Sequence, residues 1–104
     1  AFTNQAIKKY NQALYYCTQG SKDLALIQLR KVLSLNPRFV KAHLLLALVY
    51  MDAEDWDKAR KELNKCIAVD KNNTQALRYL KEVDLVTHQD EGVKSAGSVG
   101  KKKK

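Results

Sequence analysis

Apolar side chains recur every three or four residues along the first part of the chain, which is the spacing of one face of an α-helix. The first such set is Tyr10, Ala13, Leu14, Tyr16 and Cys17. Gly20 follows, and glycine readily adopts the left-handed conformation that ends many helices, while Ser21 is a residue type that caps helix starts. The pattern predicts one helix that ends near Gly20 and a second that begins after Ser21.

The second predicted helix ends at Asn36-Pro37, because proline lacks an amide donor and disfavours helix in the residue before it. The same order of signals then returns: an apolar helix over residues 43–51, a polar turn over residues 52–55 capped by Asp55, and a helix over residues 56–69. We expect a fifth helix to begin near Asn73 or Thr74, with one apolar side formed by Leu77, Leu80, Val83 and Leu85.

The chain contains an internal repeat. Residues 6–39 align with residues 40–73 without a gap, and seven aligned positions are identical. The identical pairs are Ala13/Ala47, Leu14/Leu48, Tyr16/Tyr50, Asp23/Asp57, Ala25/Ala59, Leu29/Leu63 and Lys31/Lys65. Most of them fall on the predicted apolar faces, so the repeat predicts one structural unit used twice.

The sequence resembles the tetratricopeptide repeat in the length of this unit. It also resembles it in the small residues at Ala13/Ala47 and Ala25/Ala59, in Tyr16/Tyr50 and in the Asn36-Pro37 stop. Small residues suit places where two helix axes approach closely, because a larger side chain there costs roughly 1 to 3 kcal/mol. The sequence departs from the family pattern at Gln12, Cys66 and Lys71, where leucine, alanine and proline are usual.

The resemblance covers residues 6–88 and implies an all-α fold, a right-handed helix-turn-helix solenoid. It would comprise two full repeats and a C-terminal capping helix over residues 74–88, within a domain that spans residues 4–88. Residues 89–104 are rich in Gly, Ser and Lys and carry little apolar surface, so we expect a disordered basic tail or linker there.

Tetratricopeptide repeats hold a peptide or a partner helix in a concave groove lined by the first helix of each unit. The resemblance therefore implies a protein–protein interaction scaffold. The residues that it places in the binding groove are Tyr10, Leu14, Cys17, Lys41, Leu44, Leu48, Met51 and Arg78, with Ile7, Gln75 and Glu82 beside them.

This groove is expected to be mainly apolar. The family members that clamp two carboxylates of a chaperone tail carry basic and amide side chains at places where this chain has Tyr10, Leu14 and Leu45, so such a clamp is disfavoured. The helix over residues 42–51 is apolar around its circumference apart from His43, and we expect Leu44, Leu48 and Met51 to stay exposed on the groove side.

A second interpretation stays open. The chain could be a structural spacer or self-association segment of a larger protein, with its groove filled by its own parent chain. Two and a half units are few for a repeat array, so a homodimer through an exposed end also stays open. We interpret the chain as a fragment, because it starts without Met and stops within a lysine run.

The charge is uneven. The chain has 19 basic and 11 acidic residues, a net charge of +8, of which residues 6–39 contribute six basic groups against Asp23 alone. Residues 40–73 hold six of each sign. No base-reading motif accompanies the basic residues, so nucleic-acid binding is not expected. The final lysines would suit the inner flank of a membrane anchor, which predicts membrane attachment only through sequence beyond them.

The remaining chemistry is sparse. Cys17 and Cys66 stand far apart with no ligand pair beside them, so we expect two buried reduced thiols, a cytoplasmic protein and no metal. His43 and His88 have no acid or nucleophile at a fixed local spacing. We therefore expect neither enzymatic activity nor a cofactor, and we interpret the acidic turn over residues 52–57 as helix capping.

Overall fold

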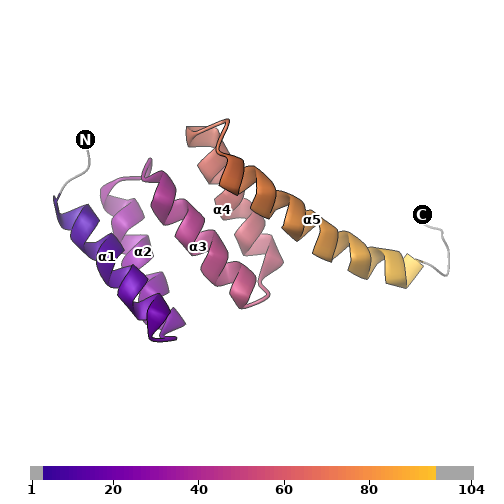
Figure 1. Ribbon diagram of the computed structural model, residues 1–104, viewed down its shortest axis with the longest axis horizontal. Helices are drawn as coiled ribbons and strands as arrows, with labels where there is room; N and C mark the ends of the chain where they lie inside the picture. The colour runs from indigo at the N-terminus through magenta and orange to yellow at the C-terminus, as the bar shows by residue number, and fades with distance from the viewer. Residues whose placement is uncertain (1–3, 96–104) are drawn as a thin grey trace.

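The computed structural model describes the backbone of residues 4–95 and the side chains of residues 4–88. Five helices follow one another: α1 Asn4–Thr18, α2 Lys22–Leu35, α3 Val40–Asp52, α4 Trp56–Val69 and α5 Thr74–Ser95 (Figure 1). Each helix packs against the next one in the chain, and α5 also touches α3. The predicted all-α fold and its five helices are confirmed.

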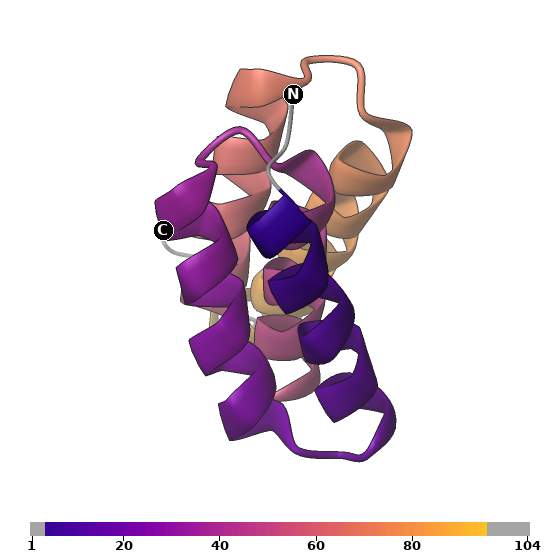
Figure 2. The same ribbon diagram turned by 90° about the vertical axis from the view of Figure 1, so that its left-hand side faces the viewer.

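The helices form two rows. Figure 2 shows the second helices, α2 and α4, on one side of the molecule, and α1 and α5 on the other. This arrangement follows from the repeat, because each unit is a hairpin of two helices and successive hairpins stack in the same orientation. The first helices therefore line one face of the array, and the second helices line the opposite face, which we call the outer face.

The turn inside each hairpin has the same hydrogen bonds in both units. In the first, Gly20 has a positive φ of 75°, and the Ser21 amide donates to the Tyr16 carbonyl at 2.9 Å. In the second, Glu54 takes the place of Gly20 with a φ of 60°, and the Asp55 amide donates to the Tyr50 carbonyl at 2.9 Å. This is the pattern with which a left-handed residue ends a helix.

The predicted caps are only partly correct. The Asp55 carboxylate accepts a hydrogen bond from the Lys58 amide at 3.4 Å, and the Asn73 side chain accepts one from the Ala76 amide at 2.9 Å. Ser21 stands at the N-cap of α2, but its side chain makes no capping hydrogen bond. Its backbone is already held by the Gly20 turn, so the start of α2 is set without the hydroxyl.

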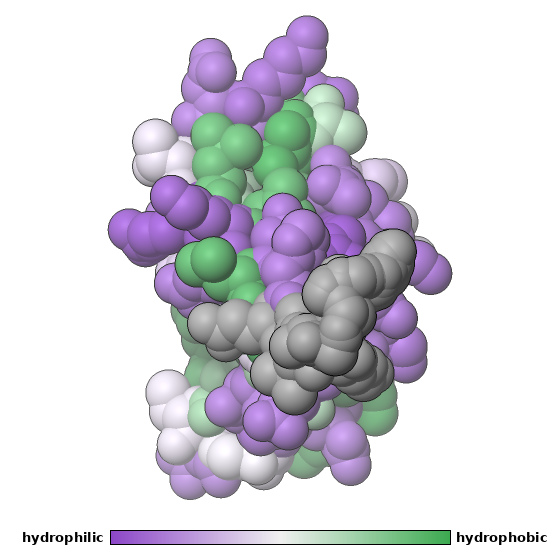
Figure 3. Space-filling model, turned by 90° about the vertical axis from the view of Figure 1, so that its right-hand side faces the viewer, coloured by the Kyte–Doolittle hydropathy of each residue, from purple (hydrophilic) through white to green (hydrophobic). Residues whose placement is uncertain are grey.

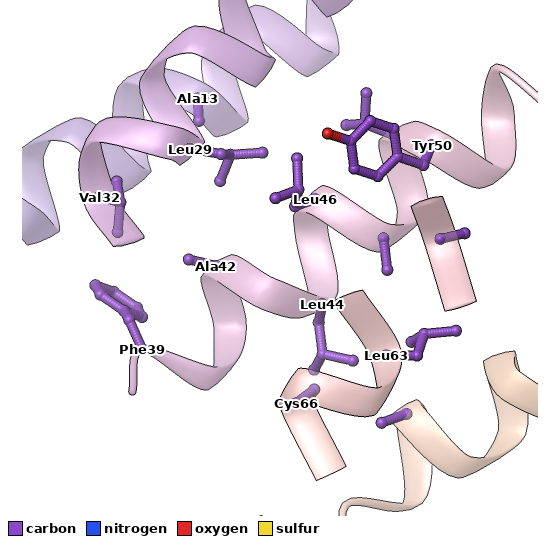
Figure 4. Close-up of a cluster of buried hydrophobic side chains, with 14 of the residues drawn as sticks. Ala13, Leu29, Val32, Phe39, Ala42, Leu44, Leu46, Tyr50, Leu63 and Cys66 are labelled. Carbon is purple, nitrogen blue, oxygen red and sulfur yellow. The ribbon is translucent and has the colours of Figure 1, made fainter. Parts of the chain in front are cut away.

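The core lies between the two rows (Figure 4). Its small members, Ala13, Ala25, Ala47 and Ala59, are fully buried, as expected for close helix contacts. The equivalent pairs Leu29/Leu63 and Val32/Cys66 are also fully buried, so Cys66 serves as a small apolar residue. Both cysteines are free, but Cys17 is only half-buried, contrary to the expectation that it would be buried.

The last helix is longer than predicted. It ends at Ser95 rather than at residue 88, and its later turns point away from the other helices (Figure 1). Residues 89–95 contain no proline, and Gly92 alone costs a helix about 1 kcal/mol, too little to stop it. The part of the expected tail over residues 96–104 lies outside the described residues.

Polar contacts fasten α5 to α4. Arg60 donates to Asp84 at 2.9 Å and to Thr87 at 3.1 Å.

The end of the array that α5 forms shows hydrophobic residues between hydrophilic ones (Figure 3). Among the α5 residues whose side chains are described, the exposed large apolar ones are Leu77 and Leu85. Within the described residues, no helix is both long enough and apolar enough to cross a bilayer.

Candidate peptide-binding groove

The first helices enclose an apolar pocket of about 310 Å³, which we call the groove pocket. Three helices supply its walls. The lining residues are Tyr10 and Leu14 from α1, Lys41, Leu44, Leu45 and Leu48 from α3, and Gln75 and Tyr79 from α5. These positions recur at spacings of three or four on each helix, so each set lies along one face.

Aromatic stacking fixes the α1 wall of the groove pocket. The rings of Tyr10 and Phe39 lie 5.2 Å apart at an angle of 26°, and Phe39 is the N-cap residue of α3. Burial raises the pKa of the Tyr10 hydroxyl, and nearby Cys17 adds to the shift. Tyr10 therefore stays neutral, and its ring ties α1 to the turn that leads into α3.

Exposure differs sharply among the groove leucines. Leu44 is only 7% exposed and packs in the core, whereas Leu14 and Leu48 are 39% and 36% exposed. The prediction that Leu44 would remain exposed is therefore wrong, and Met51 is half-buried. Leu44 forms the floor of the groove pocket and lies beside Cys66 and Leu63 of α4 (Figure 4), whereas Leu14 and Leu48 form its rim.

Of the predicted groove residues, Tyr10, Leu14, Lys41, Leu44 and Leu48 come together in the groove pocket. Cys17, Met51 and Arg78 do not line it. Arg78 lies over the ring of Tyr79, with its guanidinium carbon 5.3 Å from the ring centre. Tyr79 was missed, although it occupies the place of Leu45 in the third, partial unit, so the repeat alignment could have found it.

The polar end of the groove pocket is formed by Lys41 and Gln75. Lys41 is exposed and has no ion pair with any residue whose side chain the structure describes. The remaining side chains of the lining are leucines and tyrosines. The groove pocket therefore combines an apolar wall with one unpaired positive charge.

A second polar feature lies on the other side of α3. His43 is 5% exposed, and its ring nitrogens face the Pro37 carbonyl at 2.7 Å and the Glu62 carboxylate at 3.0 Å. Lys65 also donates to Glu62 at 3.2 Å. Burial would raise the pKa of Glu62, but the hydrogen bonds from His43 and Lys65 outweigh it and lower that pKa.

His43 and Glu62 are 19 residues apart on different helices, so a search for acids at fixed local spacings could not find the pair. The network joins α3, α4 and the turn that contains Pro37. Each of these groups already has a partner, so the network links the two helices of the second unit to each other and to the turn that joins the units. Burial raises the pKa of both cysteine thiols, which disfavours the reactive thiolate.

No group of three or more His, Cys, Asp or Glu side chains suited to a metal ion occurs within the described part of the chain.

A comparison with models of known protein families matches residues 4–82 to the tetratricopeptide repeat. The chain belongs to the tetratricopeptide repeat family. A search of curated proteins finds no match. Tetratricopeptide repeats are non-enzymatic modules that generally mediate protein–protein interaction, and the match includes every residue that lines the groove pocket.

Proposed function

We propose that this tetratricopeptide repeat domain binds a peptide or a helix of a partner protein in the groove pocket. The observation that carries the proposal is the apolar rim. Leu14 and Leu48 expose more than a third of their surface beside a pocket whose floor is Leu44. Burying a large apolar side chain completely contributes about 1.5 to 3 kcal/mol, so a ligand that covers both leucines gains a substantial share of that.

The lining also favours one kind of ligand. Its tyrosines and leucines suit a bulky apolar side chain, and Lys41 with Gln75 at one end can bind a carboxylate or a backbone carbonyl. The two-carboxylate clamp would need several basic groups in the groove, and among the described residues of the lining Lys41 is the one basic side chain. We therefore propose a ligand that is apolar over most of its contact and polar at one end.

Selection of short peptides from a displayed random library, followed by fluorescence polarisation on the selected peptides, tests this proposal. The variants are Leu14→Glu and Leu48→Glu, each of which places a charge on the exposed rim. Either change should weaken binding about tenfold or more, the loss expected for an interface position at a binding centre. Leu44 is unsuitable for this test, because a charge at a residue 7% exposed would unfold the domain.

The matched control is Leu77→Glu, which adds the same charge at a leucine 46% exposed on α5 but outside the groove pocket lining. It should bind the selected peptides like the wild type. The helix signal in far-ultraviolet circular dichroism must be equal for all variants. The proposal fails if selection yields no peptide, or if the selected peptides bind the rim variants with unchanged affinity.

A further inference from the structure

The outer face carries an apolar stripe on α2 that the groove does not use. Its members recur at spacings of three and four along the helix, so they lie on one side of it. They are Leu24, Ile27, Lys31 and Leu35, which we call the outer stripe. The three apolar members, Leu24, Ile27 and Leu35, are 46%, 48% and 45% exposed.

The second unit shows that the fold does not require apolar residues there. The equivalent positions on α4 hold Lys58, Lys61, Lys65 and Val69. All three of these lysines are exposed. A single exposed apolar side chain needs no explanation, but three in one stripe, two of them (Leu24 and Ile27) at places where the second unit has lysine, indicate a surface that is covered in use.

The surroundings of the outer stripe are basic. Lys31 lies within it, and Lys61 stands on α4 on the same outer face; neither has an ion pair with a residue whose side chain is described. The acidic residues Asp23 and Asp57 lie in the first turns of α2 and α4, and Glu62 of α4 is buried and paired with His43 and Lys65. Positive charge therefore dominates the later turns of both helices.

The ends of these two helices lie close together. A mostly apolar hollow of about 410 Å³ joins them, lined by Leu33, Pro37, His43, Lys65, Ala68 and Val69. Exposed Arg38 follows α2 at the same end. The outer face is thus two helices wide (Figure 2). On it, α2 carries the aliphatic side chains of the outer stripe, and α4 carries lysines.

We propose that the outer face binds the surface of an anionic lipid bilayer. Aliphatic side chains flanked by lysines are the combination with which amphipathic surfaces enter the boundary between headgroups and acyl chains, where anionic lipids attract each lysine. The first unit has a single acidic residue against six basic ones, so a second copy of this chain would be repelled. A lipid surface deforms around protruding side chains and needs no enclosing pocket.

This binding is independent of the groove pocket and needs no spanning helix. It differs from the membrane attachment expected from sequence beyond the final lysines, because it uses residues of the first unit and of α4. Those final lysines would attract anionic lipid by themselves. The test therefore uses the full chain with Lys101, Lys102, Lys103 and Lys104 changed to Gln, and all variants share this background.

The probe is vesicle flotation with two lipid compositions, phosphatidylcholine alone and phosphatidylcholine with phosphatidylglycerol at a ratio of about 3:1. The background protein should float with the anionic vesicles, and less so with the neutral ones or at high salt. The decisive variant is Leu24→Lys with Ile27→Lys, which copies the residues of α4 and so should fold. It should bind anionic vesicles roughly tenfold more weakly, because it loses apolar contact.

The decisive variant adds two positive charges, so purely ionic attraction would make it bind more tightly. Leu24→Ser with Ile27→Ser, which leaves the charge unchanged, should lose binding to a similar extent. The charge-matched control is Leu77→Lys with Leu85→Lys on α5, where both leucines are exposed. It should keep its vesicle binding.

Three results would overturn the proposal: no flotation of the background protein with anionic vesicles, equal or tighter binding by the Leu24 and Ile27 variants, or an equal loss in the α5 control. Peptide binding in the groove is measured on the same proteins. The outer-stripe variants should keep it, so failure of the lipid proposal and failure of the groove proposal can be told apart.

Discussion

The two repeat units have the same backbone fold. Their side chains differ at positions that a neighbouring unit covers in one of them and leaves exposed in the other. Gln12 of α1 and Leu46 of α3 occupy the same place in their units. Gln12 is exposed, whereas Leu46 is 3% exposed because the first unit packs over it. The same position of the repeat can therefore lie on the surface in one unit and in the core in the next. Its side chain is polar where it is exposed and apolar where it is buried.

The same difference appears along the whole face of the first helices. α1 presents Lys8, Asn11, Gln12 and Tyr15, all exposed, where α3 has Ala42, Leu45, Leu46 and Val49. At the other end, Lys81 of α5 stands where Ala13 and Ala47 allow close approach of a second helix. The α1 end of the array is thus built differently from the interior contacts, with mostly polar side chains, whereas the α5 end keeps the exposed Leu77 and Leu85 as well as Lys81.

The largest effect on stability is expected from exchanging the residues at the Gln12/Leu46 position. Leu46→Gln should destabilise the domain by about 3 to 5 kcal/mol, because it loses buried apolar contacts and leaves an amide unpaired. The reverse change, Gln12→Leu, should alter stability by less than about 1 kcal/mol, since this side chain is exposed. Urea unfolding of both variants measures the difference. Equal costs would show that the first unit also buries this position.

The Glu62 network should give the second unit a sensitivity to acid that the first lacks, since Gln28 occupies the equivalent place. The pKa of Glu62 is lowered by folding. Its contribution to stability is therefore present above the ordinary carboxyl pKa and is lost as pH falls through the lower folded value. Glu62→Gln should cost about 1 to 3 kcal/mol at pH 7.

The difference between wild type and Glu62→Gln should shrink as the pH falls below about 4. Thermal unfolding between pH 3 and pH 7 measures it, with Gln28→Ala as the control in the first unit. A difference that stays constant over this range would contradict a charged Glu62 in the folded protein.

The smallest effect on stability is expected at the two left-handed turn residues, Gly20 and Glu54. Glu54→Gly should stabilise the domain by up to about 1 kcal/mol, because glycine adopts a positive φ without steric cost. Gly20→Ala should destabilise it by a similar amount, although the space around Gly20 is open, because the strain lies in the backbone. Paired unfolding curves test both. Stabilisation by Gly20→Ala would argue against the left-handed conformation there.

Local signals in the sequence determined the helices and most of their ends. Gly20, Asn36-Pro37, Asp55 and Asn73 act on residues only a few positions away, so their effects can be read without knowing the fold. The internal repeat then indicated the hairpin units and the face that lines the groove. The end of α5 at Ser95 escaped prediction, because nothing in residues 89–95 forbids or demands a helix.

Tertiary structure alone decided how deeply each face is covered. Periodicity put Leu44 and Leu48 on one side of α3, but the packing of the neighbouring helices buried Leu44 and left Leu48 at the rim. It also brought Glu62 to His43 and turned Tyr79 into the groove pocket. These outcomes depend on distances between helices far apart in the chain, and spacing along a single helix carries no information about them.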